Sequence, residues 1–178
     1  MHDRGLSRLI EERLISAASS IGPSEEELPL AIDVVSRFAA LFWISVDEDG
    51  AWYEDCTVAL KAGDSWQPCT EGGGHGDDWE TPWRPPAEGW KGQPMAIFGS
   101  AGMDLPDEAD EIVQVRGLYG FATPQVTSIR VNQGSDSRLI GMASPAGAFV
   151  VVITGAEALE LQGLDDHGQI VGQLSIST

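Results

Sequence analysis

The last third of the chain alternates between apolar and polar residues, and glycine-containing turns separate the alternating runs. Alternation with a period of two sends successive side chains to opposite faces of a β-strand. Residues 113–119, 127–132 and 169–176 show this pattern, so each run predicts a strand with one buried and one hydrated face. Residues 149–153 are apolar throughout, which is typical of a central strand covered on both sides. The chain from residue 95 onward is therefore expected to form a β-sandwich.

The first forty residues favour helix instead. Residues 6–18 place apolar side chains at helical spacing, which predicts an amphipathic helix. These side chains are Leu6, Leu9, Ile10, Leu14 and Ala17. Ser24 and Glu27 have the spacing of a capping box, which predicts a second helix over about 24–40. Pro29 is compatible with that helix only near its first turn.

From Leu41 the period changes to two and predicts a three- or four-stranded β-meander over 41–70, with Asp49-Gly50 as a tight turn. Residues 71–94 lose all periodicity and are rich in glycine, proline and tryptophan, so they predict a long loop. The expected organisation is a helical segment (1–40), a meander (41–70), this loop (71–94) and a sandwich (95–178). The meander and the sandwich are expected to share one compact domain.

The stretch from Val126 carries a strand, turn and strand pattern that ends in an aspartate-x-x-glycine turn at 165–168. This pattern resembles the immunoglobulin-like β-sandwich modules of many actinobacterial proteins of unassigned function. The resemblance covers the last third of the chain and implies a mainly β, immunoglobulin-like fold, but it brings no catalytic residue with it. The stretch lacks the cysteines and the tryptophan of an immunoglobulin core.

The chain carries 28 acidic and 10 basic residues, which gives a formal net charge of −18. Such a surface repels phosphate backbones, so nucleic acid is not an expected partner, and its main expected role is solubility. The longest apolar run, 38–44, is too short to cross a bilayer, and residues 1–20 lack a signal-peptide pattern. We therefore expect a cytoplasmic protein without a membrane span.

The two cysteines, Cys56 and Cys69, are too few for a disulfide framework or a four-thiolate zinc site. If the hairpin between them pairs Leu60 with Ser65, Cys56 falls opposite Cys69, at a separation that a disulfide can bridge. A disulfide and two free thiols are equally compatible with the sequence. An oxidised pair would indicate an extracytoplasmic compartment.

One acidic cluster could hold a cation. His75, Asp77 and Asp78 follow a run of glycines, with Glu71 and Glu80 close by in the sequence. Carboxylate and imidazole groups on a glycine-rich backbone can converge on a metal ion. The spacing matches no established metal motif, and a flexible linker is the favoured interpretation. No cofactor is expected.

Four tryptophans lie within a short stretch, at Trp66, Trp79, Trp83 and Trp90. Tryptophan offers a large rigid contact surface with one hydrogen-bond donor at its edge. On a glycine- and proline-rich loop these side chains could fold over the sandwich as a lid, which is the favoured interpretation. Alternatively, they could face outward and bind a sugar or a protein.

Signatures of catalysis are weak. Ser100 lies beside a glycine but not in a Gly-x-Ser-x-Gly elbow, and His167 falls in a predicted turn, where it would be hydrated. The expected function is therefore non-enzymatic, as a module for protein interaction or assembly whose contact surface is the tryptophan-rich loop and the acidic N-terminal half. A carbohydrate or small-molecule binder that uses the loop tryptophans is the alternative, and an enzyme of unidentified class comes third. The sequence leaves the oligomeric state open.

Overall fold

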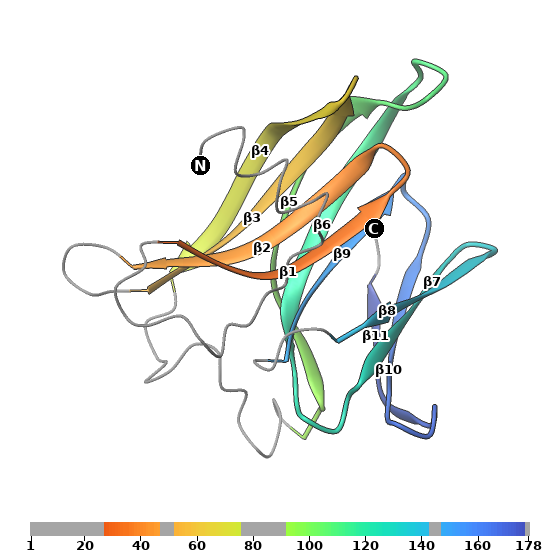
Figure 1. The fold of residues 1–178 in the computed structure, drawn as a ribbon. Coiled ribbons are helices and arrows are strands. Elements are labelled where there is room, and N and C mark those ends of the chain that lie inside the picture. Colours follow the sequence, from red (N-terminus) through yellow and green to blue (C-terminus); the bar gives the residue numbers. More distant parts are fainter. Residues whose placement is uncertain (1–26, 47–51, 76–91, 143–146, 177–178) are drawn as a thin grey trace.

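A computed structural model describes residues 27–46, 52–75, 92–142 and 147–176, and the regular structure in these ranges is antiparallel β (Figure 1). The strands are β1 (Glu27–Val35), β2 (Phe38–Val46), β3 (Trp52–Ala62), β4 (Ser65–His75), β5 (Met95–Pro106), β6 (Ile112–Ala122), β7 (Ser128–Gln133), β8 (Asp136–Gly141), β9 (Ala148–Thr154), β10 (Leu159–Leu164) and β11 (Ile170–Ile176). The prediction of a mainly β protein is confirmed. Within the described ranges there is no helix that could cross a bilayer.

The strands form three sheets. The meander sheet has the order β1-β2-β3-β4, the middle sheet β5-β6-β9, and the C-terminal sheet β11-β10-β7-β8. The middle sheet lies between the other two, because alternate residues of its strands belong to two different hydrophobic cores. In β9, Val150 and Val152 face the meander sheet, whereas Val151 and Ile153 face the C-terminal sheet. The prediction that 149–153 is covered on both sides is therefore confirmed, but the strand is terminal rather than central in its sheet.

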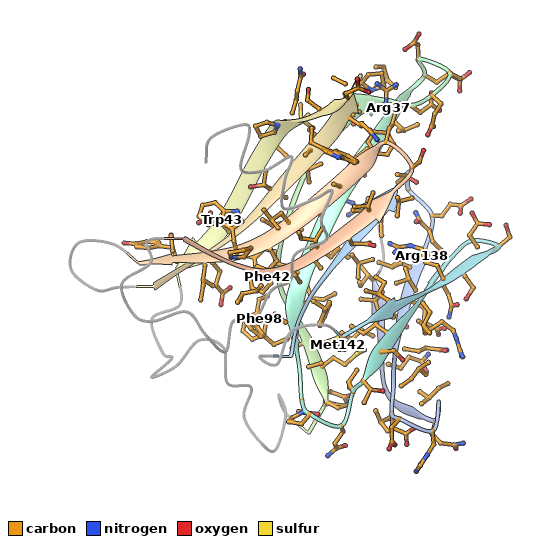
Figure 2. The ribbon with its side chains drawn as sticks, in the orientation of Figure 1. Arg37, Phe42, Trp43, Phe98, Arg138 and Met142 are labelled. Carbon is orange, nitrogen blue, oxygen red and sulfur yellow. The ribbon has the colours of Figure 1, made fainter. Side chains whose placement is uncertain are left out.

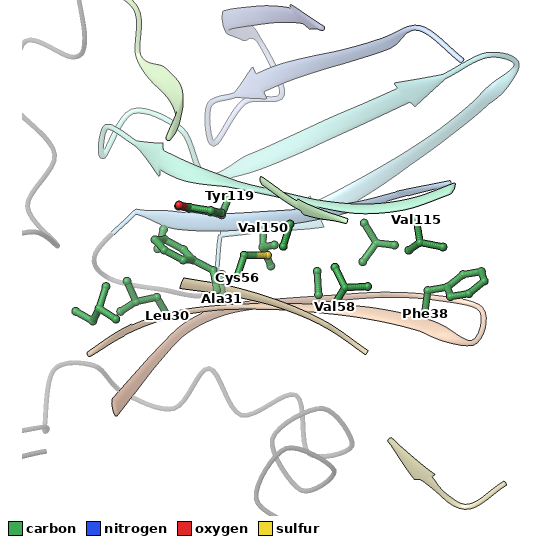
Figure 3. Packing of buried hydrophobic residues seen from close by; sticks show 14 of the residues in the cluster. Leu30, Ala31, Phe38, Cys56, Val58, Val115, Tyr119 and Val150 are labelled. Atoms are coloured by element: carbon green, nitrogen blue, oxygen red, sulfur yellow. The ribbon is translucent and has the colours of Figure 1, made fainter. Parts of the chain in front are cut away.

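The first core fills the space between the meander sheet and the middle sheet (Figure 3). Phe42 stacks on Tyr119 with the ring centroids 4.6 Å apart, and Phe121 meets Phe42 edge to face at 5.3 Å. Aromatic pairs of this kind add to the stabilisation that comes from burial alone. The two sheets also approach at both edges, with β1 beside β9 and β4 beside β5. A Cβ added at Gly72 would lie 3.1 Å from the Cβ of Ala101, so glycine allows β4 its close approach to β5.

The second core lies between the middle sheet and the C-terminal sheet. Leu118 and Phe149 of the middle sheet pack there with Ile129 and Leu161 of the C-terminal sheet. The inward residues of β7 and β10 are apolar and the residues between them are polar, as the two-residue period predicts. The strands predicted at 113–119, 127–132 and 169–176 correspond to β6, β7 and β11 and are confirmed. The hydrated face predicted for 113–119 is wrong, because β6 is the central strand of the middle sheet and residues 117–119 are buried on both faces.

The helix predicted over 24–40 is wrong for the described residues, which form β1, a turn and the start of β2. The strand went unrecognised because both of its faces are apolar. Leu30 belongs to the first core, whereas Ile32 belongs to a cluster on the opposite face of the sheet. Pro29 lies beside an irregularity in the pairing of this edge strand, a place where a missing N–H is tolerated. Residues 1–26, with the helix predicted at 6–18, lie outside the described residues.

The meander is longer than predicted. It begins at Glu27, and β4 continues to His75, so residues 71–75 belong to a strand rather than to a loop. The remainder of the predicted loop up to residue 91 lies outside the described residues. Within β2, Phe42 enters the first core and its neighbour Trp43 lies on the other side of the sheet; both are labelled in Figure 2.

The hairpins β5–β6 and β10–β11 share one kind of five-residue turn. In each, a carboxylate oxygen of the first aspartate, Asp107 or Asp165, accepts two backbone N–H groups at 2.8 to 2.9 Å. The fourth residue is left-handed in both turns, with φ of 59° at Asp110 and 74° at Gly168. The turn predicted at 165–168 is confirmed. The β5–β6 turn is more strained, because aspartate, here Asp110, tolerates positive φ less readily than glycine.

Candidate functional site

A row of hydrogen-bonded polar side chains crosses the outer face of the C-terminal sheet, and we call it the polar row. It consists of Ser137 on β8, Arg130 and Asn132 on β7, Glu160 and Gln162 on β10, and Gln173 on β11. The Glu160 carboxylate is its centre, because it accepts from Asn132 at 3.0 Å, from Gln162 at 2.8 Å and from Gln173 at 2.5 Å. Ser137 extends the row to β8 with a 2.7 Å bond to Asn132. These bonds restrict the side chains of the polar row to one arrangement.

One edge of this face is the exposed strand β8. It is the last strand in the order of the C-terminal sheet, and among the described strands it pairs only with β7. Leu139 is 62% exposed and lies opposite Arg130 in the register, so it stands at the end of the polar row. An edge strand offers N–H and C=O groups to any extended segment that approaches it. The edge therefore combines an apolar anchor with backbone hydrogen-bonding capacity.

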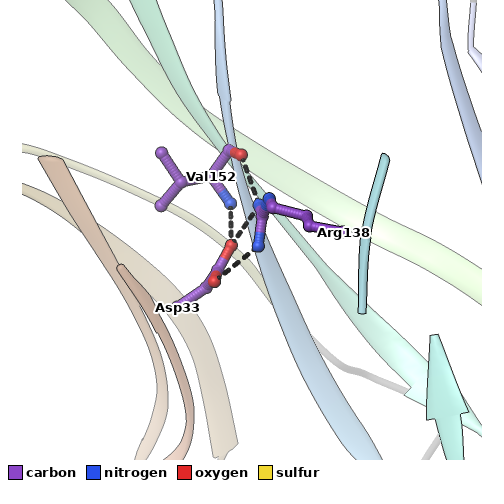
Figure 4. A network of polar contacts seen from close by, with 3 residues as sticks. All are labelled: Asp33, Arg138 and Val152. Atoms are coloured by element: carbon purple, nitrogen blue, oxygen red, sulfur yellow. Dashed lines mark hydrogen bonds and ion pairs between the residues drawn. The ribbon is translucent and has the colours of Figure 1, made fainter. Parts of the chain in front are cut away.

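Arg138, the neighbour of Leu139, points the other way and fixes β8 to the rest of the molecule. Its guanidinium forms two hydrogen bonds with the Asp33 carboxylate, at 2.8 and 2.5 Å (Figure 4). It also donates to the carbonyl oxygen of Val152 at 2.8 Å, and the N–H of Val152 donates to Asp33 at 2.7 Å. Charge-assisted, bidentate contacts of this kind are strong and directional. We call these three residues the clamp.

The clamp ties all three sheets together. Asp33 comes from β1, Val152 from β9 and Arg138 from β8. Because β9 is the terminal strand of the middle sheet, the outward backbone groups of Val152 have no strand to pair with. The carboxylate and the guanidinium take the place of that strand, so this edge is closed and β8 is held rigidly beside it.

A second group of polar atoms lies inside the first core. Glu54 is only 6% exposed, and burial raises the pKa of its carboxyl from 4.5 to about 7. Burial, and secondarily the charge of Glu54, also raises the pKa of Tyr119. The pKa of Cys56 is raised to about 12 by burial, so its thiol is not a nucleophile at neutral pH. Glu54 is the group of this set that changes charge near neutrality, and its direct consequence is a pH-dependent stability.

The predicted pairing of the two cysteines is wrong. The hairpin turn lies at Gly63-Asp64, so Ser65 pairs with Ala62 rather than with Leu60. Further along the hairpin, the β3–β4 register shifts between Val58 and Ala59. Cys56 therefore lies opposite Gly72 rather than opposite Cys69. Both cysteines are free thiols in the structure. Cys56 instead packs in the first core, with its sulfur 3.7 Å from the carbonyl oxygen of Gly117.

The tryptophans predicted to form a lid or a binding surface are only partly described. Trp66 is on β4, not on a loop, and is 3% exposed, so its ring is not an open platform for a ligand. Lys61 lies over this ring, 5.8 Å from its centroid. Trp79, Trp83 and Trp90 lie outside the described residues, and the choice between lid and binding surface stays open for them.

The candidate metal site at His75, Asp77 and Asp78 stays a prediction. His75 ends β4, and Asp77, Asp78 and Glu80 lie outside the described residues. In the ranges that the structure describes, no three histidine, cysteine or acidic side chains are grouped so that they could hold a metal ion.

Sequence reasoning missed the clamp and the β8 edge. Asp33 had a usable signal, because it is the single charged residue in the apolar run 28–35, and a charge in such a run requires a partner. Arg138 had no local signal, since its partner is distant in the sequence. The polar row was predicted only in part, as the hydrated faces of β7 and β11; no hydrated strand was predicted at β10.

Comparison of the chain with protein-family models, with curated proteins and with solved structures found no match.

Proposed function

We propose that the chain is a non-enzymatic protein-interaction module that binds an extended segment of a partner protein along β8. The observation that carries this proposal is the exposed edge of the C-terminal sheet, where Leu139 is 62% exposed beside an ordered polar face. Addition of a strand to a sheet edge is a recurring mode of peptide recognition, in which main-chain hydrogen bonds give affinity and side chains give specificity.

The proposed scaffold for this function is an immunoglobulin-like sandwich formed by β5 to β11. Its support is the strand order. In immunoglobulin-like domains strands A, B and E share one sheet, and C, F and G share the other. Strands β5, β6 and β9 occupy the places of A, B and E, whereas β7, β10 and β11 occupy those of C, F and G. Strand β8 then takes the place of an additional strand beside C.

Three features favour β8 as the binding edge. The clamp holds Arg138 and therefore the strand itself in one position, which reduces the entropy lost on binding. Leu139 points outward and can bury its side chain against an apolar residue of the partner. The net charge of −18 favours a segment that carries basic residues, because long-range attraction speeds the encounter.

The test is a selection of random peptides, displayed on phage, against the full chain. We expect selected peptides to contain basic residues and to protect the amides of β8 from hydrogen exchange. Leu139→Glu should weaken their binding by about tenfold or more. The matched control is Ile170→Glu on β11, where the side chain is 52% exposed at the opposite edge of the same sheet, and it should leave binding unchanged.

Three outcomes would contradict the proposal. Peptides that protect another part of the chain would move the binding site away from β8. An equal loss of binding in Leu139→Glu and Ile170→Glu would show that added charge, rather than the edge, governs binding. A selection that yields no β8 binders would remove the edge as a recognition surface.

A further inference from the structure

Gly141, the last residue of β8, is a glycine that the fold itself does not require. A fold needs glycine where φ is positive or where a Cβ would be crowded by another atom. Every other glycine whose surroundings the structure describes meets one of these conditions; Gly163 is crowded by Met95, and Gly168 has a φ of 74°. At Gly141 φ is not positive, and an added Cβ would have no atom within 4 Å. The missing side chain therefore leaves open space at this point of the sheet.

That space lies on the outer face of the C-terminal sheet, beside Leu139. Side chains alternate between the two faces along a strand, so Gly141, Leu139 and Ser137 share one face. Ser137 identifies it as the outer face, because its hydroxyl bonds to Asn132 of the polar row at 2.7 Å. Leu139 is 62% exposed. The outer face of β8 thus offers an apolar side chain with room for a large group next to it.

The same residues direct their backbone groups toward the open edge. The N–H of Met142 donates to the carbonyl oxygen of Thr127 at 3.1 Å, so it points to the side of β7. The direction of the N–H and C=O groups alternates from one residue to the next along a strand. Those of Gly141, Leu139 and Ser137 consequently point away from β7, to the edge where no described strand pairs. An antiparallel segment would form its hydrogen-bonded pairs with these residues and place the paired side chains on the outer face.

Each position along this edge favours a different side chain in the partner. An aromatic ring opposite a strand glycine can lie over it, and from there it reaches diagonally to Leu139. Leu139 itself is best covered by an aliphatic side chain directly opposite. At the other end of β8 the exposed carboxylate of Asp136 favours a basic residue, in agreement with the net charge of −18.

We infer that the segment bound along β8 runs antiparallel to it, with an aromatic residue opposite Gly141, an aliphatic residue opposite Leu139 and a basic residue opposite Asp136. In the partner these residues occupy the first, third and sixth positions of one extended segment. The antiparallel direction is favoured because parallel pairing has slanted hydrogen bonds and is less stable. This inference rests on the proposed function of the β8 edge, to which it adds the direction and the sequence pattern of the partner.

The test uses a peptide from the phage selection that protects the β8 amides, synthesised with its aromatic residue intact or replaced by alanine. Gly141→Thr and Ser137→Thr are a matched pair of variants in the full chain, because each ends with the same side chain on the outer face, two residues from Leu139. Fluorescence polarisation measures the binding. We expect Gly141→Thr to weaken binding of the intact peptide about tenfold or more and Ser137→Thr to weaken it less than about twofold.

The alanine peptide shows whether the aromatic residue and Gly141 are coupled. With the parent chain, alanine in place of the aromatic residue should also weaken binding about tenfold. With Gly141→Thr the same replacement should cause little further loss, because the space over the glycine is already filled. Gly141→Thr should remain folded, since no atom crowds the added side chain, and thermal unfolding checks this. If it unfolds, Gly141→Ala is compared in its place, with an expected loss of binding of about threefold.

The outcomes separate this inference from the proposed function. The inference is overturned if Gly141→Thr and Ser137→Thr have equal effects on binding. It is also overturned if the peptides that protect β8 lack the aromatic residue or carry the basic residue before it. In these cases the β8 edge remains the binding site as long as Leu139→Glu weakens binding. Peptides that protect another part of the chain overturn the proposed function, and this inference with it.

Discussion

The two sheets that flank the middle sheet differ in the polarity of their outer faces. Each covers one face of the middle sheet with apolar side chains. The outer face of the C-terminal sheet is polar and is organised around Glu160, whereas the outer face of the meander sheet is apolar and contains Leu41, Trp43 and Trp66. Among the described residues, the C-terminal sheet therefore has one apolar and one polar face, whereas the meander sheet is apolar on both faces.

This difference separates what each sheet can do. A sheet with one polar face can present that face and its edge to a partner without exposing a large apolar area. A sheet with two apolar faces has no face left for solvent and serves as an inner layer. The C-terminal sheet is thus the better candidate for recognition, and the meander sheet is the better candidate for stability.

Truncating one leucine on each outer face gives the largest expected contrast. Leu41→Ala should lower the free energy of unfolding by about 3 kcal/mol, because lost burial and a residual cavity act together. Leu139→Ala should change it by less than about 0.5 kcal/mol, because the side chain is already in water. Urea unfolding followed by circular dichroism measures both. Similar losses in the two variants would remove the contrast between the outer faces.

The clamp gives the next largest effect. Asp33→Ala leaves the Arg138 guanidinium and the Val152 N–H without their acceptor and should lower the free energy of unfolding by about 2 kcal/mol. Glu160→Ala is the comparison in the polar row, where water can replace the lost acceptor, and should lower it by about 1 kcal/mol. Removing Arg138 as well as Asp33 should recover part of the loss. A larger loss of stability in Glu160→Ala than in Asp33→Ala would show that the polar row contributes more to stability than the clamp.

The inner face of the meander sheet makes stability depend on pH. Because burial raises the pKa of Glu54 from 4.5 to about 7, the folded state binds the proton more tightly than the unfolded state. The stability linked to this proton is fully present below pH 4.5 and declines as the pH rises to about 7. Glu54→Gln should therefore be neutral at the acidic end and should stabilise the protein by about 3 kcal/mol above pH 7.

Urea unfolding at a series of pH values checks this prediction. Glu108→Gln, in the exposed β5–β6 turn, removes one negative charge without involving burial and serves as the control. Its effect should be small at every pH. A difference between Glu54→Gln and the parent that does not grow with pH would contradict the role of Glu54.

The smallest expected effects distinguish the two related turns. Asp110→Gly should raise the free energy of unfolding by about 0.5 kcal/mol, because glycine adopts positive φ without strain. Glu108→Gly in the same turn should lower it by a similar amount, since glycine there only adds freedom to the unfolded chain. In the C-terminal sheet, Gly168→Ala should lower it by about 1 kcal/mol. Thermal unfolding monitored by calorimetry measures the order of stability among these variants. A destabilised Asp110→Gly variant would show that the Asp110 side chain has another role.

The same contrast explains which elements could be predicted from sequence. The period of two identified β7 and β11 because one face of the C-terminal sheet meets water. It failed for β1, where Leu30 and Ile32 are buried on opposite faces and no alternation remains. Local patterns also could not place Cys56, since its register depends on a hairpin turn two residues shorter than expected and on an irregular pairing in β4. The candidate site was the least predictable part, because Arg138 meets Asp33 only through the tertiary fold.

The position of the middle sheet has a consequence for biosynthesis. All four strands of the meander sheet leave the ribosome early, but the surface that their inner face requires includes β9, which is made much later. Until then the nascent chain carries an apolar layer that β5 and β6 can cover only in part, a state prone to aggregation. The dependence of folding on chaperones in the cell should therefore be set by the time between the synthesis of β4 and that of β9. Lengthening the chain between these two strands should increase that dependence most.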